Sequence, residues 1–182
     1  MSAFSQIDLG PLKDKLERLP FALTIADDSA PDHPLIYSNS AFTDMTGYGP
    51  EKMGYNCRFL QEDLPNFAAR AEVRDALSQR RKTQVMLHNQ RANGEKFYNL
   101  LLLYPLPATA TMPKLTVGSQ FDLGPVNPET IRDPDEVTYE DRLARLRRHA
   151  DQTRLERRRL VTEAAVRLIQ SWYVIKDTDL DL

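Results

Sequence analysis

The side chain best suited to covalent chemistry is Cys57, the only cysteine in the chain. It stands between Asn56 and Arg58 in the segment GYNCRFLQ, residues 54–61. If this segment forms a helical turn, Cys57 and Gln61 share one face and Arg58 points about 100° away. The turn would then offer a thiol to one part of a ligand and a cation to another. The alternative is an inert, buried cysteine that behaves as a small apolar residue.

Three amide side chains interrupt apolar stretches later in the chain: Asn89, Asn99 and Gln120. A buried amide without a partner costs roughly 1–3 kcal/mol, and each amide offers both a donor and an acceptor. If the three converge on one face of a sheet, they suit a heterocycle whose edge alternates N–H and C=O groups. Arg58 and Arg74 add two cations suited to a phosphate. The alternative is that these polar residues face solvent, where they cost little.

The pattern around these residues predicts an α+β fold, a five-stranded antiparallel sheet with small helices over one face. Strand-like runs occupy residues 21–27, 34–39, 83–90, 95–106 and 114–123. The pair Asn93–Gly94 is a strong hairpin signal between the third and fourth runs. Short helical turns are expected within residues 40–61, and a longer helix at 68–80. The strands would carry the amides, and the helices would carry the thiol and both arginines.

Prolines and changes of periodicity divide the chain into four predicted segments. Residues 1–20 form an N-terminal helical cap, and residues 21–123 form the core. Residues 124–137 are a proline-rich linker, and residues 138–182 are a C-terminal helical extension.

The spacing of the candidate residues resembles that of light-oxygen-voltage (LOV) flavin photoreceptor domains, a branch of the PAS fold. Relative to Cys57, matching residue types lie at +1, +4, +17, +32, +42 and +63, namely Arg58, Gln61, Arg74, Asn89, Asn99 and Gln120. The resemblance covers residues 21–123 and is to the short bacterial type without a catalytic output domain. After Gln61 the run EDLPNFAARA departs from the Gly-Pro pair and further basic residues of many members. The resemblance therefore implies nothing about the geometry of the helix and loop in that segment.

The resemblance implies a blue-light photoreceptor that is not an enzyme and that binds flavin mononucleotide (FMN) without a metal. On illumination Cys57 would form a reversible cysteinyl adduct with the flavin atom C4a. The resemblance implies that Arg58 and Arg74 bind the FMN phosphate and that Asn56 and Gln61 bind its ribityl chain. It also implies that Asn89 and Asn99 contact the pyrimidine edge of the ring and that Gln120 contacts O4 and N5. Because adduct formation protonates N5, the Gln120 amide would reorient.

Thr24 occupies a position near the reactive centre that is often aliphatic in this family. Its hydroxyl could alter the hydration of N5 and hence the adduct lifetime. Equally, it could satisfy a backbone carbonyl.

Residues 138–175 have helical periodicity with two apolar lanes: Leu160, Ala164, Leu168 and Trp172 beside Val161, Ala165, Ile169 and Tyr173. A continuous helix would span about 57 Å at 1.5 Å per residue, which one small core cannot cover. We therefore expect a homodimer through this tail and the N-terminal helix, with signalling by changed helix packing or dimerisation. The alternative is that the tail packs against its own sheet.

Charge and composition constrain the remaining partner classes. A net charge of -2 argues against a surface devoted to nucleic acid or to anionic membranes. Eight arginines within residues 142–159 leave a light-regulated DNA-binding regulator as the alternative function, although charge runs usually mark a solvated face. A flavin enzyme is a third class, but the three histidines, His33, His88 and His149, show no local pairing with Cys57. With no internal disulfide and no apolar run of roughly 18 residues, we expect a cytoplasmic protein without a membrane segment.

Overall fold

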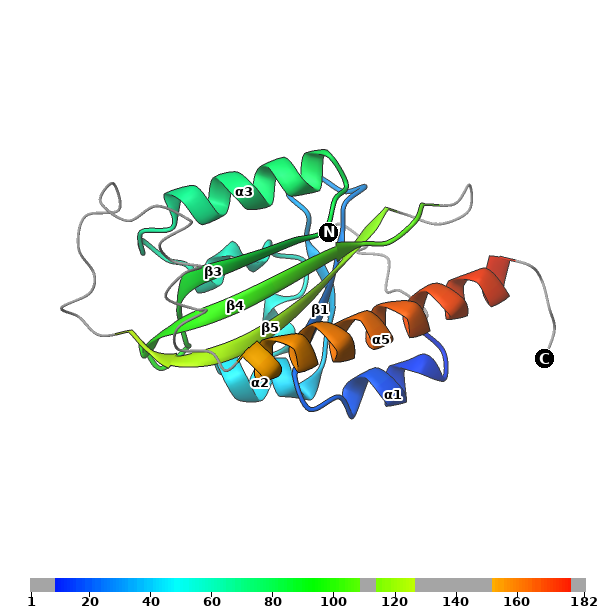
Figure 1. Cartoon of the computed structure of the whole chain (residues 1–182), viewed down its shortest axis with the longest axis horizontal. Helices are drawn as coiled ribbons and strands as arrows, with labels where there is room; N and C mark the ends of the chain where they lie inside the picture. Colours follow the sequence, from blue (N-terminus) through cyan, green and yellow to red (C-terminus); the bar gives the residue numbers. More distant parts are fainter. Residues whose placement is uncertain (1–8, 109–113, 127–151, 178–182) are drawn as a thin grey trace.

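The centre of the molecule is a five-stranded antiparallel sheet with the order β2-β1-β5-β4-β3 (Figure 1). The computed structural model describes residues 9–108, 114–126 and 152–177. The strands are β1 (Ala22–Asp27), β2 (Leu35–Ser38), β3 (Thr83–Gln90), β4 (Lys96–Pro105) and β5 (Leu115–Pro125). The α+β fold and the five-stranded sheet predicted from the sequence are confirmed.

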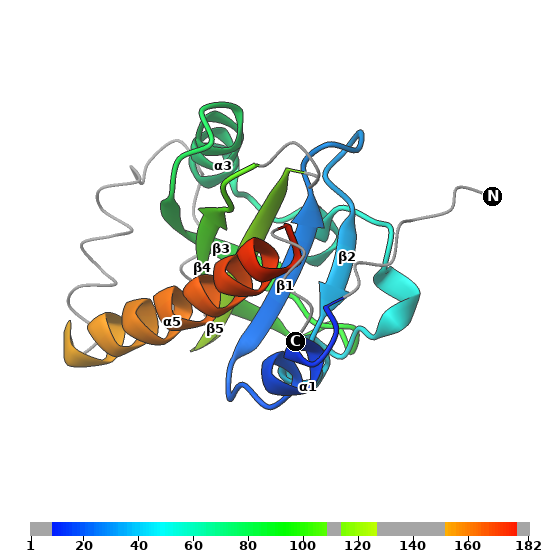
Figure 2. The same ribbon diagram turned by 90° about the vertical axis from the view of Figure 1, so that its right-hand side faces the viewer.

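Helices cover both faces of this sheet. The inner face carries α2 (Ser40–Thr46), the single 3₁₀ turns η1 (Pro50–Lys52) and η2 (Cys57–Leu60), and α3 (Phe67–Ser78). The outer face carries α1 (Leu12–Glu17) and the long helix α5 (Gln152–Asp177), which crosses the sheet in Figure 2. The site residues therefore lie between the sheet and the small helices.

Asn39 joins the elements at one end of the inner face. Its side-chain oxygen accepts hydrogen bonds from the backbone N–H groups of Leu23, at 2.9 Å, and Phe42, at 3.1 Å. Its side-chain nitrogen donates to the carbonyls of Leu16 and Phe21. An asparagine at a helix N-cap satisfies otherwise unpaired donors, and this one also holds α1 and α2 against β1.

The tail packs against its own sheet in the described residues, which was the alternative to packing on a second copy. Ala165, Val166 and Ile169 of α5 are buried in one apolar core with Leu12 and Leu16 of α1. Of the two predicted apolar lanes, the side chains of Ala165 and Ile169 are buried, whereas Leu160, Val161, Ala164 and Leu168 are exposed. One core therefore covers only one side of the helix.

The inner face has two separate apolar clusters instead of one continuous core. One contains Ala22, Phe42 and Leu60, and the other contains Ala69, Val85 and Leu87. Leu60 and Leu87, one from each cluster, both line a single large cavity. A space of this kind between packed clusters is unusual in a close-packed interior and indicates room for a ligand.

Several expected boundaries differ from the observed ones by one or two residues. Strand β5 continues to Pro125, two residues into the predicted linker, because Phe97 and Val126 extend the pairing of β4 with β5 at that end. The short helical turn expected at Cys57 is a 3₁₀ turn, and α3 spans residues 67–78 instead of 68–80. The predictions for residues 127–151, which include most of the linker and the start of the tail, lie outside the described residues.

Candidate ligand-binding site

A cavity of about 540 Å³ lies between the inner face of the sheet and the small helices. All nine residues singled out in the sequence line it: Thr24, Asn56, Cys57, Arg58, Gln61, Arg74, Asn89, Asn99 and Gln120. Apolar side chains from β3, β4 and α3 complete the wall. A volume of this size is in the range of pockets that hold cofactor-sized molecules. The structure therefore brings the predicted site residues together, while the role of each one stays a prediction.

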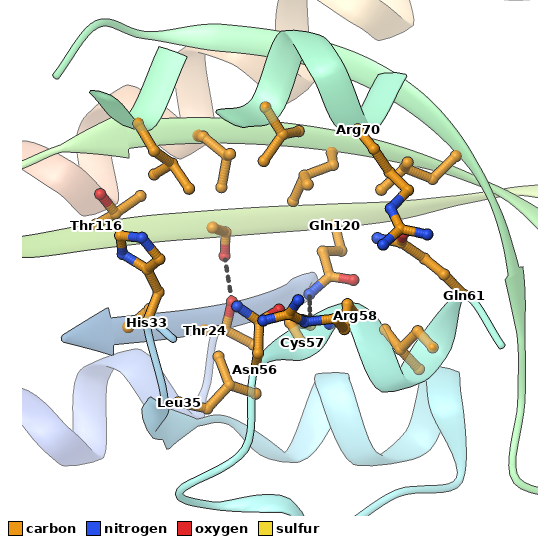
Figure 3. A pocket seen from close by; sticks show the side chains of 18 of the residues that line it. Thr24, His33, Leu35, Asn56, Cys57, Arg58, Gln61, Arg70, Thr116 and Gln120 are labelled. Carbon is orange, nitrogen blue, oxygen red and sulfur yellow. Dashed lines mark hydrogen bonds between the residues drawn. The ribbon is translucent and has the colours of Figure 1, made fainter. Parts of the chain in front are cut away.

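Cys57 lies at the start of η2, with its thiol directed toward the sheet (Figure 3). The side-chain nitrogen of Gln120 on β5 lies 3.7 Å from Cys57 Sγ and donates a weak hydrogen bond to it. Desolvation raises the pKa of the thiol to about 12, and the bond from Gln120 opposes this increase. Cys57 is therefore a neutral thiol at physiological pH, and it can react only with a partner that accepts its proton.

A row of buried amides begins at Gln120. Asn99 on β4 donates from Nδ2 to Gln120 Oε1 at 2.8 Å. The side-chain oxygens of Asn89, Asn99 and Gln61 are buried, and none has a hydrogen-bond partner among the described residues. Each orphaned acceptor costs roughly 1–3 kcal/mol unless a ligand supplies a donor. The orphans therefore fit a polar heterocycle with N–H and hydroxyl groups.

Three arginines line the cavity. Arg58 belongs to η2, and Arg74 and Arg70 lie one turn apart on α3. Arg70 extends toward Gln61 in Figure 3 and also lines an adjoining cavity of about 270 Å³. Sequence reasoning missed Arg70, although its spacing of four residues from Arg74 was a usable signal. The cluster is suited to an anionic group such as a phosphate.

Thr24 and Asn56 use their polar atoms within the chain. The Thr24 hydroxyl donates to the carbonyl of Gly118 at 3.4 Å, in agreement with the expectation that it could satisfy a backbone carbonyl. Asn56 caps η2 by accepting from Arg58 N at 2.9 Å, and it donates to the carbonyl of Asp32 at 2.6 Å. In this geometry Asn56 positions the element that carries Cys57.

A charged cluster that sequence reasoning missed lies elsewhere along the same cavity, around Asp28. Its carboxylate accepts from Thr116 Oγ1 at 2.5 Å and contacts Arg80 at 3.2 Å and His33 Nδ1 at 3.1 Å. Its side chain is only 7% exposed, so these donors compensate a buried charge. The local sequence shows a turn and no sign of this cluster, because its members come from three separate segments: the β1–β2 loop, the turn after α3 and β5.

Replacing Asp28 with alanine should lower the free energy of unfolding by about 2–4 kcal/mol, because it removes the acceptor of Thr116 and leaves Arg80 with only the Leu106 carbonyl. Urea denaturation followed by circular dichroism would measure the change. Asp44, an exposed carboxylate on α2, provides the control, and Asp44→Ala should change stability by less than about 0.5 kcal/mol. Equal effects of the two substitutions would contradict the assigned role of Asp28.

The residue after Gln120 connects the cavity wall to the outer face. Because strand side chains alternate, Phe121 points away from the cavity, where its ring stacks on Phe21 at 5.5 Å. The guanidinium of Arg158 on α5 lies 5.2 Å from the centre of the Phe121 ring. Burial, followed by repulsion from Arg154, lowers the pKa of Arg158. A movement of β5 at Gln120 would therefore reach α5 through one side chain.

Two other kinds of site are absent from the part of the chain that the structure describes. It contains no group of three or more histidine, cysteine, aspartate or glutamate residues that could hold a metal ion. Within the same residues, no helix combines the length and the apolar character needed to cross a membrane.

Comparison with known proteins identifies the fold and the family. Residues 20–123 match the family model described as a PAS domain. The chain is 40% identical over 131 residues to Blue-light-activated histidine kinase 2 of Erythrobacter litoralis, an alignment that covers 71% of this chain and 36% of the kinase. The chain thus spans about a third of the length of that curated relative.

Two solved structures agree with this assignment. The LOV domain of the Erythrobacter litoralis EL346 blue-light activated histidine kinase is 44% identical with a TM-score of 0.54, and the match covers 59% of this chain and 99% of that domain. The Rhodobacter sphaeroides LOV protein is 36% identical with a TM-score of 0.59, and the match covers 89% of this chain and 94% of that protein. The chain therefore belongs to the PAS domain family and, within it, to the light-oxygen-voltage photoreceptor domains.

Proposed function

We propose that this blue-light photoreceptor domain binds FMN in the large cavity and uses Cys57 as its photochemical residue. LOV domains bind flavin chromophores, and the residues present here fit such a group. The orphaned oxygens of Asn89 and Asn99 suit the N3–H group of a flavin pyrimidine ring, and the three arginines suit a terminal phosphate. The observation that carries the proposal is the Cys57 thiol on the wall of this amide-lined cavity, 3.7 Å from Gln120 Nε2.

When bound, the flavin would supply blue-light absorption and a carbon atom, C4a, to which the cysteine sulfur can add reversibly. Cys57 would supply both the sulfur and the proton, which must pass to a nearby acceptor because the thiol is neutral. Gln120 can donate through nitrogen or accept through oxygen, so its amide can rotate to match a cofactor atom that gains a proton. Among the described residues, Cys57 has no acid or base as a hydrogen-bond partner, which favours photochemistry over enzymatic turnover.

The test is optical. Purified protein reconstituted with FMN should be yellow, should lose its blue absorption band under blue light, and should recover it in darkness. The recovery must be complete over repeated cycles, since the reaction consumes nothing. Protein that binds no flavin, or that holds flavin whose spectrum does not respond to light, would contradict the proposed function.

For the output, we propose that the Gln120 amide acts on α5 through Phe121 and Arg158, and that α5 forms a homodimer. The exposed residues Leu160, Val161, Ala164 and Leu168 form an apolar stripe along α5, here called the α5 stripe. Such a stripe on a helix is better buried against a partner than left in water. The leucines of α1 are already buried in their own chain, so the expected interface is restricted to α5.

Leu168→Glu should convert the dimer to a monomer, because it places a charge in the α5 stripe at a side chain that is 42% exposed and lies outside the intramolecular core. Light scattering in darkness and under blue light would give the mass. Phe67→Glu is the matched control, since Phe67 is also exposed, at 68%, but lies on α3 over the opposite face of the sheet. An unchanged mass for Leu168→Glu, or an equal loss in the control, would contradict an α5 interface.

The alternative of a DNA-binding regulator would have to use the arginines of α5, and two of these are engaged within the chain. Arg158 packs on Phe121, and Arg159 donates to Gln84 on β3 at 2.9 Å. These two arginines therefore serve their own sheet, whereas Arg154 and Arg157 of α5 are exposed, and the arginines at 142–148 lie outside the described residues.

A further inference from the structure

One of the three arginines that line the cavity already has an anionic partner. Arg58 forms an ion pair with Asp32, whose carboxylate lies in the loop between β1 and β2. The guanidinium groups of Arg70 and Arg74 have no hydrogen bond or ion pair with any described residue. The nearest carboxylates on their own helix, Glu72 and Asp75, are both bound by Arg81. The cluster thus consists of one paired and two unpaired guanidinium groups.

The loop that carries Asp32 is built to hold its carboxylate at this place. Asp32 has a φ of 69° and His33 a φ of 47°, so two consecutive residues adopt the left-handed conformation that turns the chain sharply. The carbonyl of Asp32 accepts from Asn56 Nδ2 at 2.6 Å. Asn56 immediately precedes Cys57, so the loop is tied to the turn that carries both the thiol and Arg58.

The Asp32 carboxylate contacts Nη2 of Arg58, so a phosphate bound to the same guanidinium would lie beside that carboxylate. The two groups are also both anions, so they cannot share Arg58 without repulsion. The pair is half-exposed, with 50% of the Arg58 side chain and 63% of the Asp32 side chain accessible, and such pairs are weak enough to exchange. A phosphate can therefore displace Asp32, but it must compete with it.

We infer that Asp32 competes with the cofactor phosphate for Arg58, and thereby limits how strongly the site prefers a phosphorylated flavin over riboflavin. This inference rests on the proposed function, because it concerns the affinity of the same cavity. Arg70 and Arg74 provide phosphate binding that needs no exchange of partners. Arg58 provides the part of the affinity that Asp32 regulates, next to the reactive thiol.

The test compares the dissociation constants of FMN and riboflavin for the wild type and Asp32→Asn, by quenching of flavin fluorescence. Asparagine tolerates the left-handed conformation as well as aspartate does, so the loop geometry and the bond to Asn56 should persist. FMN should bind about threefold more tightly to the variant, whereas riboflavin should bind equally well to both proteins. The gain in FMN affinity of Asp32→Asn should be smaller at high salt, because the competing charges are exposed to solvent.

Two further variants separate local competition from general electrostatics. Glu62 lines the adjoining cavity with Arg58 and Arg70 but forms no ion pair among the described residues, so Glu62→Gln should leave the FMN-to-riboflavin preference unchanged. When Arg58 is already replaced by glutamine, Asp32→Asn should not change the FMN-to-riboflavin preference, because the competition requires the Arg58 guanidinium. An unchanged preference in Asp32→Asn, an equal gain in Glu62→Gln, or a gain that persists without Arg58 would overturn the inference. A wild-type protein that binds neither flavin would overturn the proposed function and this inference with it.

Discussion

Cys57→Ala is expected to leave flavin bound and to abolish the light-induced loss of the blue absorption band completely. The cavity keeps its amides and arginines in this variant, so the binding groups are intact. The sulfur is the atom that must form the new bond, and the described residues contain no second cysteine to replace it. Absorption spectra before and after a blue flash would measure the result, with thermal denaturation to show that the variant is folded.

Cys57→Ser is the closer control, because its hydroxyl replaces the thiol and can still accept a hydrogen bond from the Gln120 amide. A serine hydroxyl without an adjacent base is a much weaker nucleophile than a thiol, so this variant should also fail to bleach. A photocycle of wild-type amplitude in either variant would show that Cys57 has a different role.

The pH dependence of wild-type photobleaching follows from the protonation state of the Cys57 thiol. Burial raises the Cys57 pKa to about 12, so the group is protonated in darkness at every pH well below that value. The amplitude of bleaching should therefore be equal at about pH 6 and about pH 9, because no fraction of the thiol ionises between them. A drop in amplitude over this range would indicate a second titrating group.

The fold was predictable because its signals are local. Alternating apolar runs and the Asn93–Gly94 turn mark the β3–β4 hairpin without any knowledge of tertiary contacts. The amides were predictable for a related reason. Asn89, Asn99 and Gln120 interrupt strands that are otherwise apolar, and a polar residue at such a position must either face water or bind something.

The parts that escaped prediction depend on strand register and on loop conformation. Thr116 and Asp28 meet because β1 pairs antiparallel with β5, with Ala26 opposite Thr116. Asp32 meets Arg58 because of two left-handed residues in a loop that the sequence marks only as a turn. No periodicity contains that information.

The face of α5 that is buried was also beyond sequence reasoning. Both lanes of the helix are apolar, so the pattern shows that two surfaces exist but does not assign either one to the sheet. The shape of the outer face decides this, since Ile169 fills the core with Leu23 and Leu100 while Leu168, the next residue back, stays exposed.

Gly118→Leu is expected to weaken flavin binding by about 5- to 150-fold while the protein stays folded. Gly118 lies on β5 in the cavity wall, directly opposite Thr24 on β1. Even a methyl group built there would lie 2.8 Å from Thr24 Oγ1 and 3.7 Å from Leu101 Cδ1, so a leucine must project into the cavity. Overfilling a packed site typically costs 1–3 kcal/mol, and here the cost falls on the bound state. Equilibrium titration with FMN would measure the loss, and circular dichroism would confirm the fold.

The smaller substitution Gly118→Ala isolates the contact with Thr24. Its methyl group lies closer to Thr24 Oγ1 than real side chains allow, so the threonine must rotate and lose its hydrogen bond to the residue 118 carbonyl. Binding should weaken in Gly118→Ala and recover when Thr24→Ala is added, because the second change removes the oxygen that clashes. If Gly118→Leu bound flavin as tightly as the wild type, the flavin could not lie against this part of β5. The side chains of Thr24 and Gln120 on the cavity wall would then not contact the flavin ring.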